Sequence, residues 1–482
     1  MTLYRSFSAV QTDLRSGVVT CRQLVEHYLV RIAEQQHLNV FTEVYADESL
    51  AYADVIDQKL TNGAAGRLAG MVIGIKDVLS YAGHGVRAGS RILENFTAQF
   101  TATAVQRLLD EDAIIIGRQN CDEFAMGSSN ENSAFGPVRN AADTSRVPGG
   151  SSGGSAVAVQ AGLCLASIGS DTGGSVRQPA AFCGVVGLKP TYGRISRWGL
   201  IAYASSFDCI GPIANTVDDA ALLLEIMAGP DDFDSTVSSQ PVDAYTQAQL
   251  PASRPLRIAY LRDGVESEGV DLAIREAIQQ RISSLRQAGY VVDPIDLSLL
   301  DSLLPTYYIL TTAEASSNLS RFDGVRYGYR DASVTDLLSL YKKSRTAGFG
   351  SEVRRRILLG TFVLSASYYD AYYTKAQQVR RLIREETERV FAEYDFLLSP
   401  TTPTPAFKLG EKTEDALQMY LADIFTVQAN VVGYPAISIP NGTDASGLPI
   451  GLQLMAPPFQ EGRLVALAKE LTSDFLTMSD KR

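Results

Sequence analysis

A serine that follows two glycines is the first feature of the sequence with an evident chemical use. Ser175 ends the run Thr172-Gly173-Gly174-Ser175. Glycines allow successive backbone N–H groups to turn toward one point, and such a nest of donors can stabilise the oxyanion that forms when a carbonyl is attacked. This run could therefore supply both a nucleophile and N–H donors for acyl transfer. The same spacing is equally compatible with a serine that caps a helix beginning near Val176.

A serine hydroxyl needs a base within hydrogen-bond reach before it can attack. The histidines His27, His37 and His84 lie outside any recognisable triad pattern, so we expect them to be structural or surface residues. Lys76 is a different kind of base. It ends the apolar run MVIGIK, and burial lowers the pKa of a lysine toward the neutral form that accepts a proton. From spacing alone, the Lys76 ammonium could instead pair with the adjacent Asp77 or reach solvent.

Two glycine–serine clusters, GGSSGGS and SDTGGS, enclose the apolar segment AVAVQAGLCLASIG. Such clusters are commonly linkers, but a segment of buried character between them argues against a linker here. In the first cluster, spacing does not separate Ser151 from Ser152 as a group that could relay a proton. A phosphate cradle is disfavoured, because neither cluster is followed by Gly-Lys-Ser/Thr and no GxGxxG opens a helix after a strand.

Alternating helices and strands must position these residues. The apolar runs 71–76 and 113–117 read as buried strands, and residues 104–112 read as a helix. Thr20 and Thr216 are expected helix caps. The remaining expectations are strands at 256–260, 396–400, 436–440 and 450–456, and a helix whose buried face carries Leu272, Ile278, Ile282 and Leu285 before Gly289. This alternation favours an α/β fold with helices covering a sheet.

Composition fits a globular protein without a membrane span or secretory leader. The chain has 482 residues, 45% hydrophobic residues and a net charge of -11. That charge argues against a chain that holds nucleic acid by itself. The five cysteines form no CxxC pair, which predicts no disulfide framework or zinc site and fits a cytoplasmic location; Cys164 and Cys183 are expected to be buried.

Three segments resemble the amidase signature family: GIKD at 74–77, PGGSSGGSAVAV at 148–159 and GSDTGGSVRQPAAFCGVVGLKPTYG at 169–193. The resemblance implies a single α/β domain over 1–482 with a mixed, twisted central sheet covered by helices on both faces. We expect its core at about 60–230 and 390–475 and a helical insertion at about 300–390.

By the same resemblance, Ser175 is the nucleophile of a Ser–Ser–Lys triad, Ser151 the bridging serine and Lys76 the base. The peptide bond before Ser151 is expected to be cis. The N–H groups of Thr172, Gly173, Gly174 and Ser175 are expected to form the oxyanion hole.

Further segments, among them 120–140, 307–330, 348–365 and 422–427, resemble the A subunits of glutamyl-tRNA(Gln)/aspartyl-tRNA(Asn) amidotransferases over nearly the whole chain. The resemblance implies a glutaminase that supplies ammonia to a heterotrimer. The B and C subunits are the expected partners. The B subunit would bind most of the tRNA, and a partner would use ATP and Mg²⁺, with no cofactor or metal on this chain.

Free glutamine needs an arginine for its α-carboxylate and a carboxylate for its α-ammonium. The resemblance places Arg356 and Asp423 in these roles, with Tyr307 nearby. Arg354 and Arg355 compete with Arg356, and a solvated basic helix face is the other interpretation of the three arginines.

A stand-alone amidase acting on a small carboxylic amide is the alternative activity. A catalytically inactive scaffold is disfavoured, because all three triad positions are intact. The loop at 80–96 departs from the family pattern, since Arg87-Ala88-Gly89 stands where small polar residues and a cysteine are usual.

Overall fold

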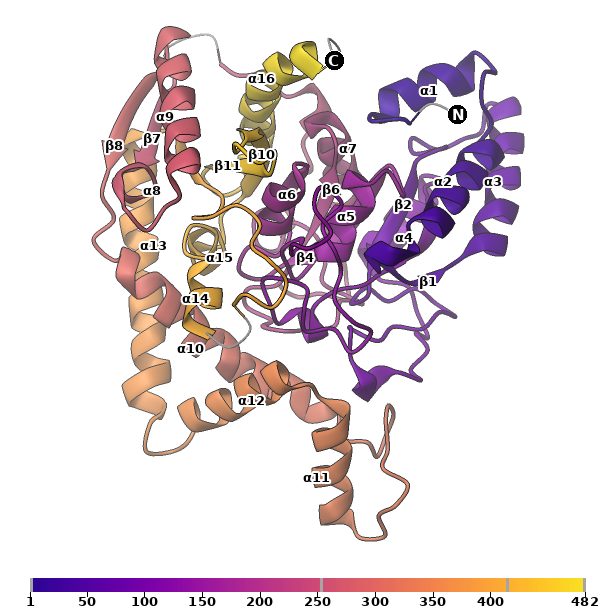
Figure 1. Ribbon diagram of the computed structural model, residues 1–482, viewed down its shortest axis with the longest axis vertical. Helices are drawn as coiled ribbons and strands as arrows, with labels where there is room; N and C mark the ends of the chain where they lie inside the picture. The colour runs from indigo at the N-terminus through magenta and orange to yellow at the C-terminus, as the bar shows by residue number, and fades with distance from the viewer. Residues whose placement is uncertain (1–2, 252–254, 413–415, 480–482) are drawn as a thin grey trace.

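The centre of the protein is one mixed β-sheet (Figure 1). The computed structural model describes residues 3–251, 255–412 and 416–479. In these ranges the sheet has 11 strands, whose order is β1-β3-β2-β4-β6-β5-β10-β11-β9-β7-β8. The strands are β1 (Phe41–Val44), β2 (Val72–Lys76), β3 (Ile114–Gln119), β4 (Ala166–Asp171), β5 (Val186–Lys189), β6 (Cys209–Ala214), β7 (Arg257–Leu261), β8 (Val291–Ile295), β9 (Phe396–Pro400), β10 (Ala436–Thr443) and β11 (Pro449–Met455).

Strand pairing brings the predicted site residues to one edge of the sheet. Strand β2 pairs in parallel with both β3 and β4, and Ile75 lies opposite Ile168. The carboxyl ends of neighbouring parallel strands meet at the same edge. Lys76, the last residue of β2, therefore lies beside the end of β4, four residues before Ser175.

Every residue of β2, β3, β4 and β6 is buried, and successive residues of a strand point to opposite faces. Both faces of the sheet are therefore covered. The expected fold class is therefore confirmed. The helices are α1 (Phe7–Arg15), α2 (Cys21–Glu34), α3 (Ala46–Thr61), α4 (Thr103–Asp110), α5 (Gly153–Gln160), α6 (Arg177–Cys183), α7 (Val217–Met227), α8 (Asp263–Glu266), α9 (Leu272–Gln287), α10 (Leu300–Asn318), α11 (Leu337–Gly348), α12 (Ser351–Val363), α13 (Lys375–Glu393), α14 (Ala416–Leu421), α15 (Val427–Val432) and α16 (Glu461–Ser479).

Local signals in the sequence predicted β2 and two helix caps, whereas β4, α5 and α6 around the site were not predicted as separate elements. Thr20 forms a capping box with Gln23, and the Thr216 side chain accepts the N–H of Asp219. One detail was wrong. The Leu272 side chain is 59% exposed, because it starts α9 before the helix turns its buried face to the sheet.

The region after residue 300 is mainly helical, with α10, α11, α12 and α13 in succession. Helix α11 extends away from the body of the protein (Figure 1). The sheet reaches beyond the expected core ranges, since β1, β7 and β8 also pair into it. The helical segment is therefore an excursion between β8 and β9 of one continuous sheet.

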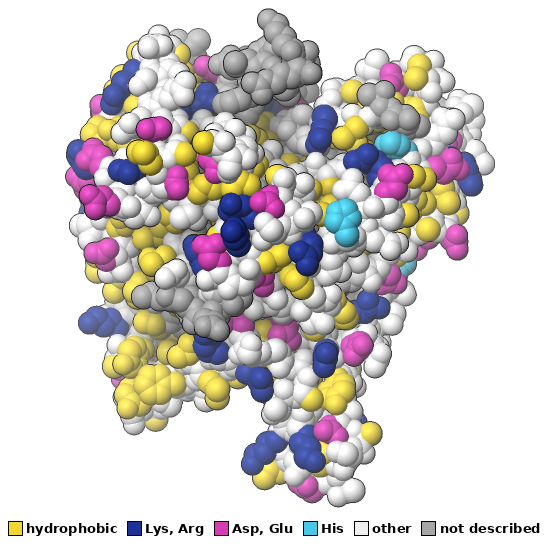
Figure 2. Space-filling model, in the orientation of Figure 1, with side chains coloured by type: hydrophobic (Ala, Val, Ile, Leu, Met, Phe, Trp, Pro, Cys, Tyr) yellow, Lys and Arg dark blue, Asp and Glu magenta, His cyan; other side chains and the backbone are white. Residues whose placement is uncertain are grey.

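The face of the protein shown in Figure 2 carries both acidic and basic side chains and one area that is more apolar. Figure 2 shows hydrophobic side chains gathered at the lower left, where α12 turns into α13. Exposed side chains there include Leu358, Phe362 and Tyr368. In the described part of the chain, no helix is long and apolar enough to cross a membrane.

Candidate active site

Lys76 is buried and points at two serine hydroxyls. Its side chain is inaccessible to solvent at the end of β2. The Lys76 Nζ donates to Ser151 Oγ at 2.7 Å and to Ser170 Oγ at 2.9 Å. Burial lowers the pKa of the Lys76 ammonium to about 8, although nearby acidic groups oppose that effect. A substantial neutral fraction is therefore present near physiological pH, as a general base requires.

The two alternative interpretations of Lys76, a pair with Asp77 or exposure to solvent, are wrong. Asp77 accepts the backbone N–H groups of Arg87 and Gly89, and it lies 3.6 Å from Nε of the buried Arg118. Among the described residues, no carboxylate forms an ion pair with Lys76. The adjacent acid thus stabilises the 80–96 loop and leaves the lysine free to face the serines.

The structure separates Ser151 from Ser152. The peptide bond between Gly150 and Ser151 is cis, as expected. Ser151 Oγ accepts the hydrogen bond from Lys76, whereas Ser152 Oγ donates to the carbonyl of Ser170 at 3.1 Å. Only the first serine therefore has its hydroxyl at the lysine.

Ser175 lies between β4 and α6, next to the first serine cluster. The backbone N–H of Ser152 donates to the Ser175 carbonyl at 3.1 Å. Helix α6 has Val176 as its N-cap and no side-chain cap, so the helix-capping interpretation of Ser175 is wrong. The Ser175 hydroxyl makes no hydrogen bond with any described residue, and the residue is 8% exposed. The hydroxyl is therefore not tied to another described group, and the proton transfer from Ser175 to Ser151 requires the two hydroxyls to approach each other when substrate binds.

The glycine turn before Ser175 is held by a carboxylate, which changes the expected oxyanion hole. Gly174 has φ +134 and donates its N–H to Asp171 Oδ1 at 2.9 Å. The N–H of Gly174 is therefore already used in a hydrogen bond. The expectation that it belongs to the oxyanion hole is wrong. The N–H groups of Thr172, Gly173 and Ser175 make no hydrogen bond with the described residues and remain as the donor set.

Sequence reasoning missed the ion pair that fixes this turn. Asp171 accepts two hydrogen bonds from Arg177, each 3.0 Å long, and both side chains are fully buried. Burial alone would raise the pKa of Asp171, but the Arg177 guanidinium overcomes it and holds the pKa at about 2. The SD-x-x-x-x-x-R spacing in the quoted motif carried this signal, since a single short turn of chain joins the two residues.

The glutamine-binding candidates come together from three distant segments. Arg356 of α12 is buried, and it donates to Glu352 Oε1 at 2.7 Å and to Tyr203 OH at 2.7 Å. Its guanidinium also lies 5.4 Å from the ring centroid of Tyr308 and 5.6 Å from that of Tyr420. An aromatic lining with one ion pair keeps the guanidinium in place.

Asp423 belongs to the same cluster. It accepts from Ser128 Oγ at 2.6 Å and from Tyr308 OH at 3.4 Å. Burial raises the pKa of Asp423 to about 7, with Ser128 and Arg356 acting against that rise. The carboxylate is therefore poised to ionise when a cation arrives.

Tyr307 lies over the glycine turn itself. A β-carbon added at Gly173 would lie 2.5 Å from the Tyr307 hydroxyl. Of the competing arginines, Arg355 is half exposed and pairs with Glu352, and Arg354 is exposed. The structure thus brings Tyr307, Arg356 and Asp423 together near Ser175, but not the other two arginines.

Comparison with known proteins identifies the family. The family model described as Amidase matches residues 23–465, most of the chain. This chain belongs to the amidase family. Its relatives within the amidase family include a curated protein of Chlorobium luteolum that is named as the A subunit of glutamyl-tRNA(Gln) amidotransferase. The two are 51% identical, and the alignment covers 97% of each chain.

Solved structures of the amidase family share the fold. The crystal structure of the glutamyl-tRNA(Gln) amidotransferase A subunit from Thermotoga maritima is 38% identical over 93% of this chain and 90% of that chain, with a TM-score of 0.75. The peptide amidase of Stenotrophomonas maltophilia is 31% identical, with 96% of each chain covered and a TM-score of 0.81. The amidase fold therefore serves both in an amidotransferase and in a hydrolase.

Proposed function

We propose that this chain is the glutamine-hydrolysing A subunit of a glutamyl-tRNA(Gln) amidotransferase, with Ser175 as its nucleophile. The buried Lys76, hydrogen-bonded to Ser151 without a carboxylate partner among the described residues, is the observation that carries the catalytic part of the proposal. The identity of 51% to a curated A subunit over 97% of the chain supports the assignment to that enzyme.

The proposed reaction begins with two proton transfers. Neutral Lys76 takes a proton from Ser151, which takes one from Ser175 as the latter attacks the side-chain amide carbon of glutamine. The N–H groups of Thr172, Gly173 and Ser175 stabilise the negative oxygen, each donor contributing about 3–4 kcal/mol in the transition state.

Collapse of this intermediate breaks the carbon–nitrogen bond. The leaving nitrogen receives a proton back through Ser151, ammonia departs, and a glutamyl ester forms on Ser175. Water, activated by the same relay, then attacks the ester and releases glutamate. The nearby Ser170 hydroxyl, 2.9 Å from Lys76 Nζ, fixes the amine during both steps.

Substrate selection depends on two charges at the other side of the site. We propose that Arg356 binds the α-carboxylate, because three of its five N–H groups remain after the bonds to Glu352 and Tyr203. Asp423 binds the α-ammonium, and the Tyr307 ring packs beside the amide group. A substrate without the amino-acid head group cannot use the remaining N–H groups of Arg356 or the Asp423 carboxylate, which disfavours it.

The partners and cofactors follow from membership in a multi-subunit enzyme. Ammonia released here would serve the conversion of Glu-tRNA(Gln) to Gln-tRNA(Gln), and of Asp-tRNA(Asn) if the complex accepts it. We propose the B and C subunits as the partners in a heterotrimer, with tRNA held mainly by the B subunit and with ATP and Mg²⁺ used outside this chain. The net charge of -11 supports a division in which a partner contacts most of the nucleic acid.

A stand-alone amidase is the second candidate, because the peptide amidase of Stenotrophomonas maltophilia has the same fold. Its identity to this chain is 31%, against 51% for the curated A subunit. The buried pair of opposite charges at Arg356 and Asp423 also favours a free amino acid over a simple amide.

The decisive experiment measures glutamine hydrolysis by the chain alone and by the reconstituted complex with ATP and misacylated tRNA. Wild-type protein should release glutamate and should co-purify with two partner chains. Ser175→Ala should abolish hydrolysis, while Ser238→Ala, a serine far along the chain and outside the site, should leave it unchanged. Retained glutaminase activity in Ser175→Ala would exclude this nucleophile.

A further inference from the structure

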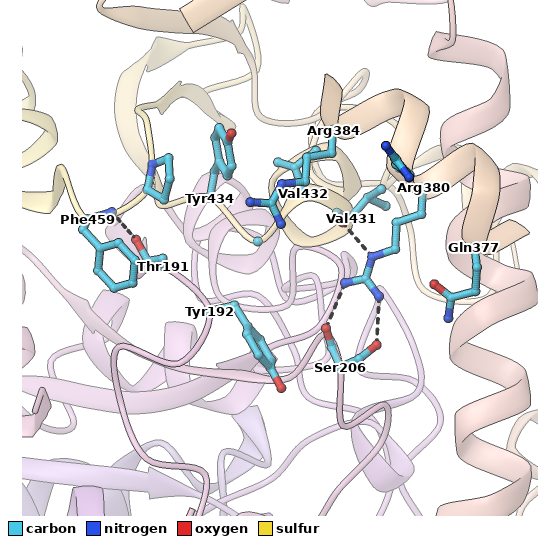
Figure 3. Close-up of a pocket in the computed structure, with 13 residues that line it drawn as sticks. Thr191, Tyr192, Ser206, Gln377, Arg380, Arg384, Val431, Val432, Tyr434 and Phe459 are labelled. Carbon is cyan, nitrogen blue, oxygen red and sulfur yellow. Dashed lines mark hydrogen bonds between the residues drawn. The ribbon is translucent and has the colours of Figure 1, made fainter. Parts of the chain in front are cut away.

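A cavity of about 510 Å³ lies against α13, the end of α15 and the segments that follow β5 and β11 (Figure 3). The proposed catalytic residues do not line it. Arg380, Arg381 and Arg384 do, and no Asp or Glu is among its described lining residues. The charged groups that line this cavity are therefore cationic, which favours an anion as its ligand.

Arg380 is the innermost of the three arginines. Its Nε donates to the Val431 carbonyl at 2.9 Å, its Nη1 to Ser206 Oγ at 2.9 Å and its Nη2 to the Ser206 carbonyl at 3.0 Å (Figure 3). Its guanidinium lies 4.1 Å from the Phe207 ring centroid. Two N–H groups of the five remain. Among the described residues, no carboxylate forms an ion pair with Arg380. The Glu314 carboxylate is hydrogen-bonded to Ser206, and its charge favours the protonated form of Arg380 without direct contact.

The other two arginines can be recruited at little cost. Arg381 pairs with Glu385 at 2.8 Å and Arg384 with Glu388 at 2.9 Å, each one turn along α13 and substantially exposed. Exposed pairs of this kind are weak and screened by salt. A guanidinium fork also matches the geometry of phosphate oxygens and can bind two of them at once.

We propose that this cavity binds a phosphate group and that its occupation alters the glutamine site through residues 203–208. The cavity is larger than a phosphate ion, and Tyr192, Tyr434 and Phe459 give it an aromatic wall. The ligand class is therefore a phosphate ester attached to a larger molecule, either a phosphorylated small molecule or the backbone of a bound tRNA.

The segment 203–208 contacts both sites. Ser206 holds the Arg380 guanidinium, as described above. Three residues earlier, Tyr203 OH accepts from Arg356 at 2.7 Å, and two residues later Asp208 accepts from Thr172 Oγ1 at 2.7 Å. A phosphate that draws Arg380 away from Ser206 would therefore shift contacts of both the glutamine arginine and the oxyanion turn. This coupling rests on the proposed glutaminase site, whereas phosphate binding does not.

Binding is tested by calorimetric titration of the full-length chain with inorganic phosphate and with pyrophosphate at low ionic strength. The double variant Arg381→Gln/Arg384→Gln should weaken pyrophosphate binding by about 100-fold, since each charge-assisted contact contributes about tenfold. Arg389→Gln removes the same charge from the same helix outside the cavity and should change binding less than about twofold. Absence of binding to the wild type, or an equal loss in Arg389→Gln, would overturn the proposed site.

Coupling is tested by glutamine hydrolysis with and without saturating pyrophosphate. The kcat/KM of the wild type should change by about fivefold or more, and that of the double variant should not respond while its basal activity stays normal. Pyrophosphate that binds without changing kcat/KM refutes the coupling alone, and a wild type without any glutaminase activity contradicts the proposed function instead.

The source of the phosphate is tested on the reconstituted complex. If tRNA is the ligand, the double variant should weaken tRNA binding and lower its salt dependence. If a small molecule is the ligand, tRNA binding should stay unchanged while pyrophosphate binding is lost.

Discussion

The ionisation of Lys76 should set the acidic limb of the pH profile for glutamine turnover. Only the neutral amine can take the proton from Ser151, and burial holds the Lys76 pKa at about 8. The neutral fraction is then about one half at pH 8, about one tenth at pH 7 and about one hundredth at pH 6. The kcat should therefore fall about tenfold for each pH unit below the pKa of the lysine.

Steady-state kinetics between about pH 6 and pH 9.5 would measure this limb, with glutamate release as the readout. The kcat must be separated from KM, because burial raises the pKa of Asp423 to about 7 and we propose that this carboxylate binds the substrate ammonium. Lys76→Arg provides the matched variant, since arginine keeps the charge and stays protonated throughout this range. It should show no recovery of activity at high pH.

Two results would refute this reasoning. A kcat limb centred at about pH 6.5 would indicate a histidine as the base. In the structure, the ring of one histidine, His84, lies 3.0 Å from Glu48. Substantial turnover in Lys76→Arg with a normal fold would remove the lysine from the proton relay altogether.

Three further changes test other parts of the site. Ser151→Ala should lower kcat by about 100-fold or more, because it interrupts the relay, whereas Ser152→Ala should cost about tenfold at most; equal losses would contradict the assignment. Asp423→Asn should raise the KM for glutamine by about 30-fold or more with a smaller effect on kcat, and an unchanged KM would place the ammonium elsewhere. Gly173→Ala should lower stability by about 1–3 kcal/mol and reduce turnover, since its β-carbon would lie 2.5 Å from the Tyr307 hydroxyl; thermal unfolding and kinetics measure both effects.

Some elements were predictable because short-range signals determine them, whereas β4, α5 and α6 around the serines were not predicted. The apolar run before Lys76 forms β2, and Thr216 caps α7 as expected. The apolar runs at 71–76 and 113–117 indicated buried strands, whereas helices on both faces of the sheet were implied by the resemblance to the amidase signature family. Most boundaries of the predicted elements shifted by one or two residues, and the strand expected at 436–440 continues to Thr443.

Contacts between distant segments could not be read from the chain. Ser151 and Ser152 are adjacent and chemically identical, and only the direction of each side chain assigns one to Lys76 and the other to Ser170. The hydrogen bond from the Gly174 N–H to Asp171 is local, but it was also missed, because a partner three residues away depends on how the turn is folded. The sequence shows which polar groups are present, but the tertiary structure determines which of them form hydrogen bonds with one another.

Burial shifts the pKa values of Lys76 and Asp423 in opposite directions. Desolvation makes the charged form of Lys76 costly, and it makes the charged form of Asp423 costly as well. For the lysine this produces the neutral amine that the relay needs before substrate arrives. For the aspartate it produces a carboxyl group that ionises fully once the glutamine ammonium lies beside it, so binding of the cation and loss of the proton are linked. Under the proposed mechanism the two titrations act on different steps, so that of Lys76 should appear in kcat and that of Asp423 in KM.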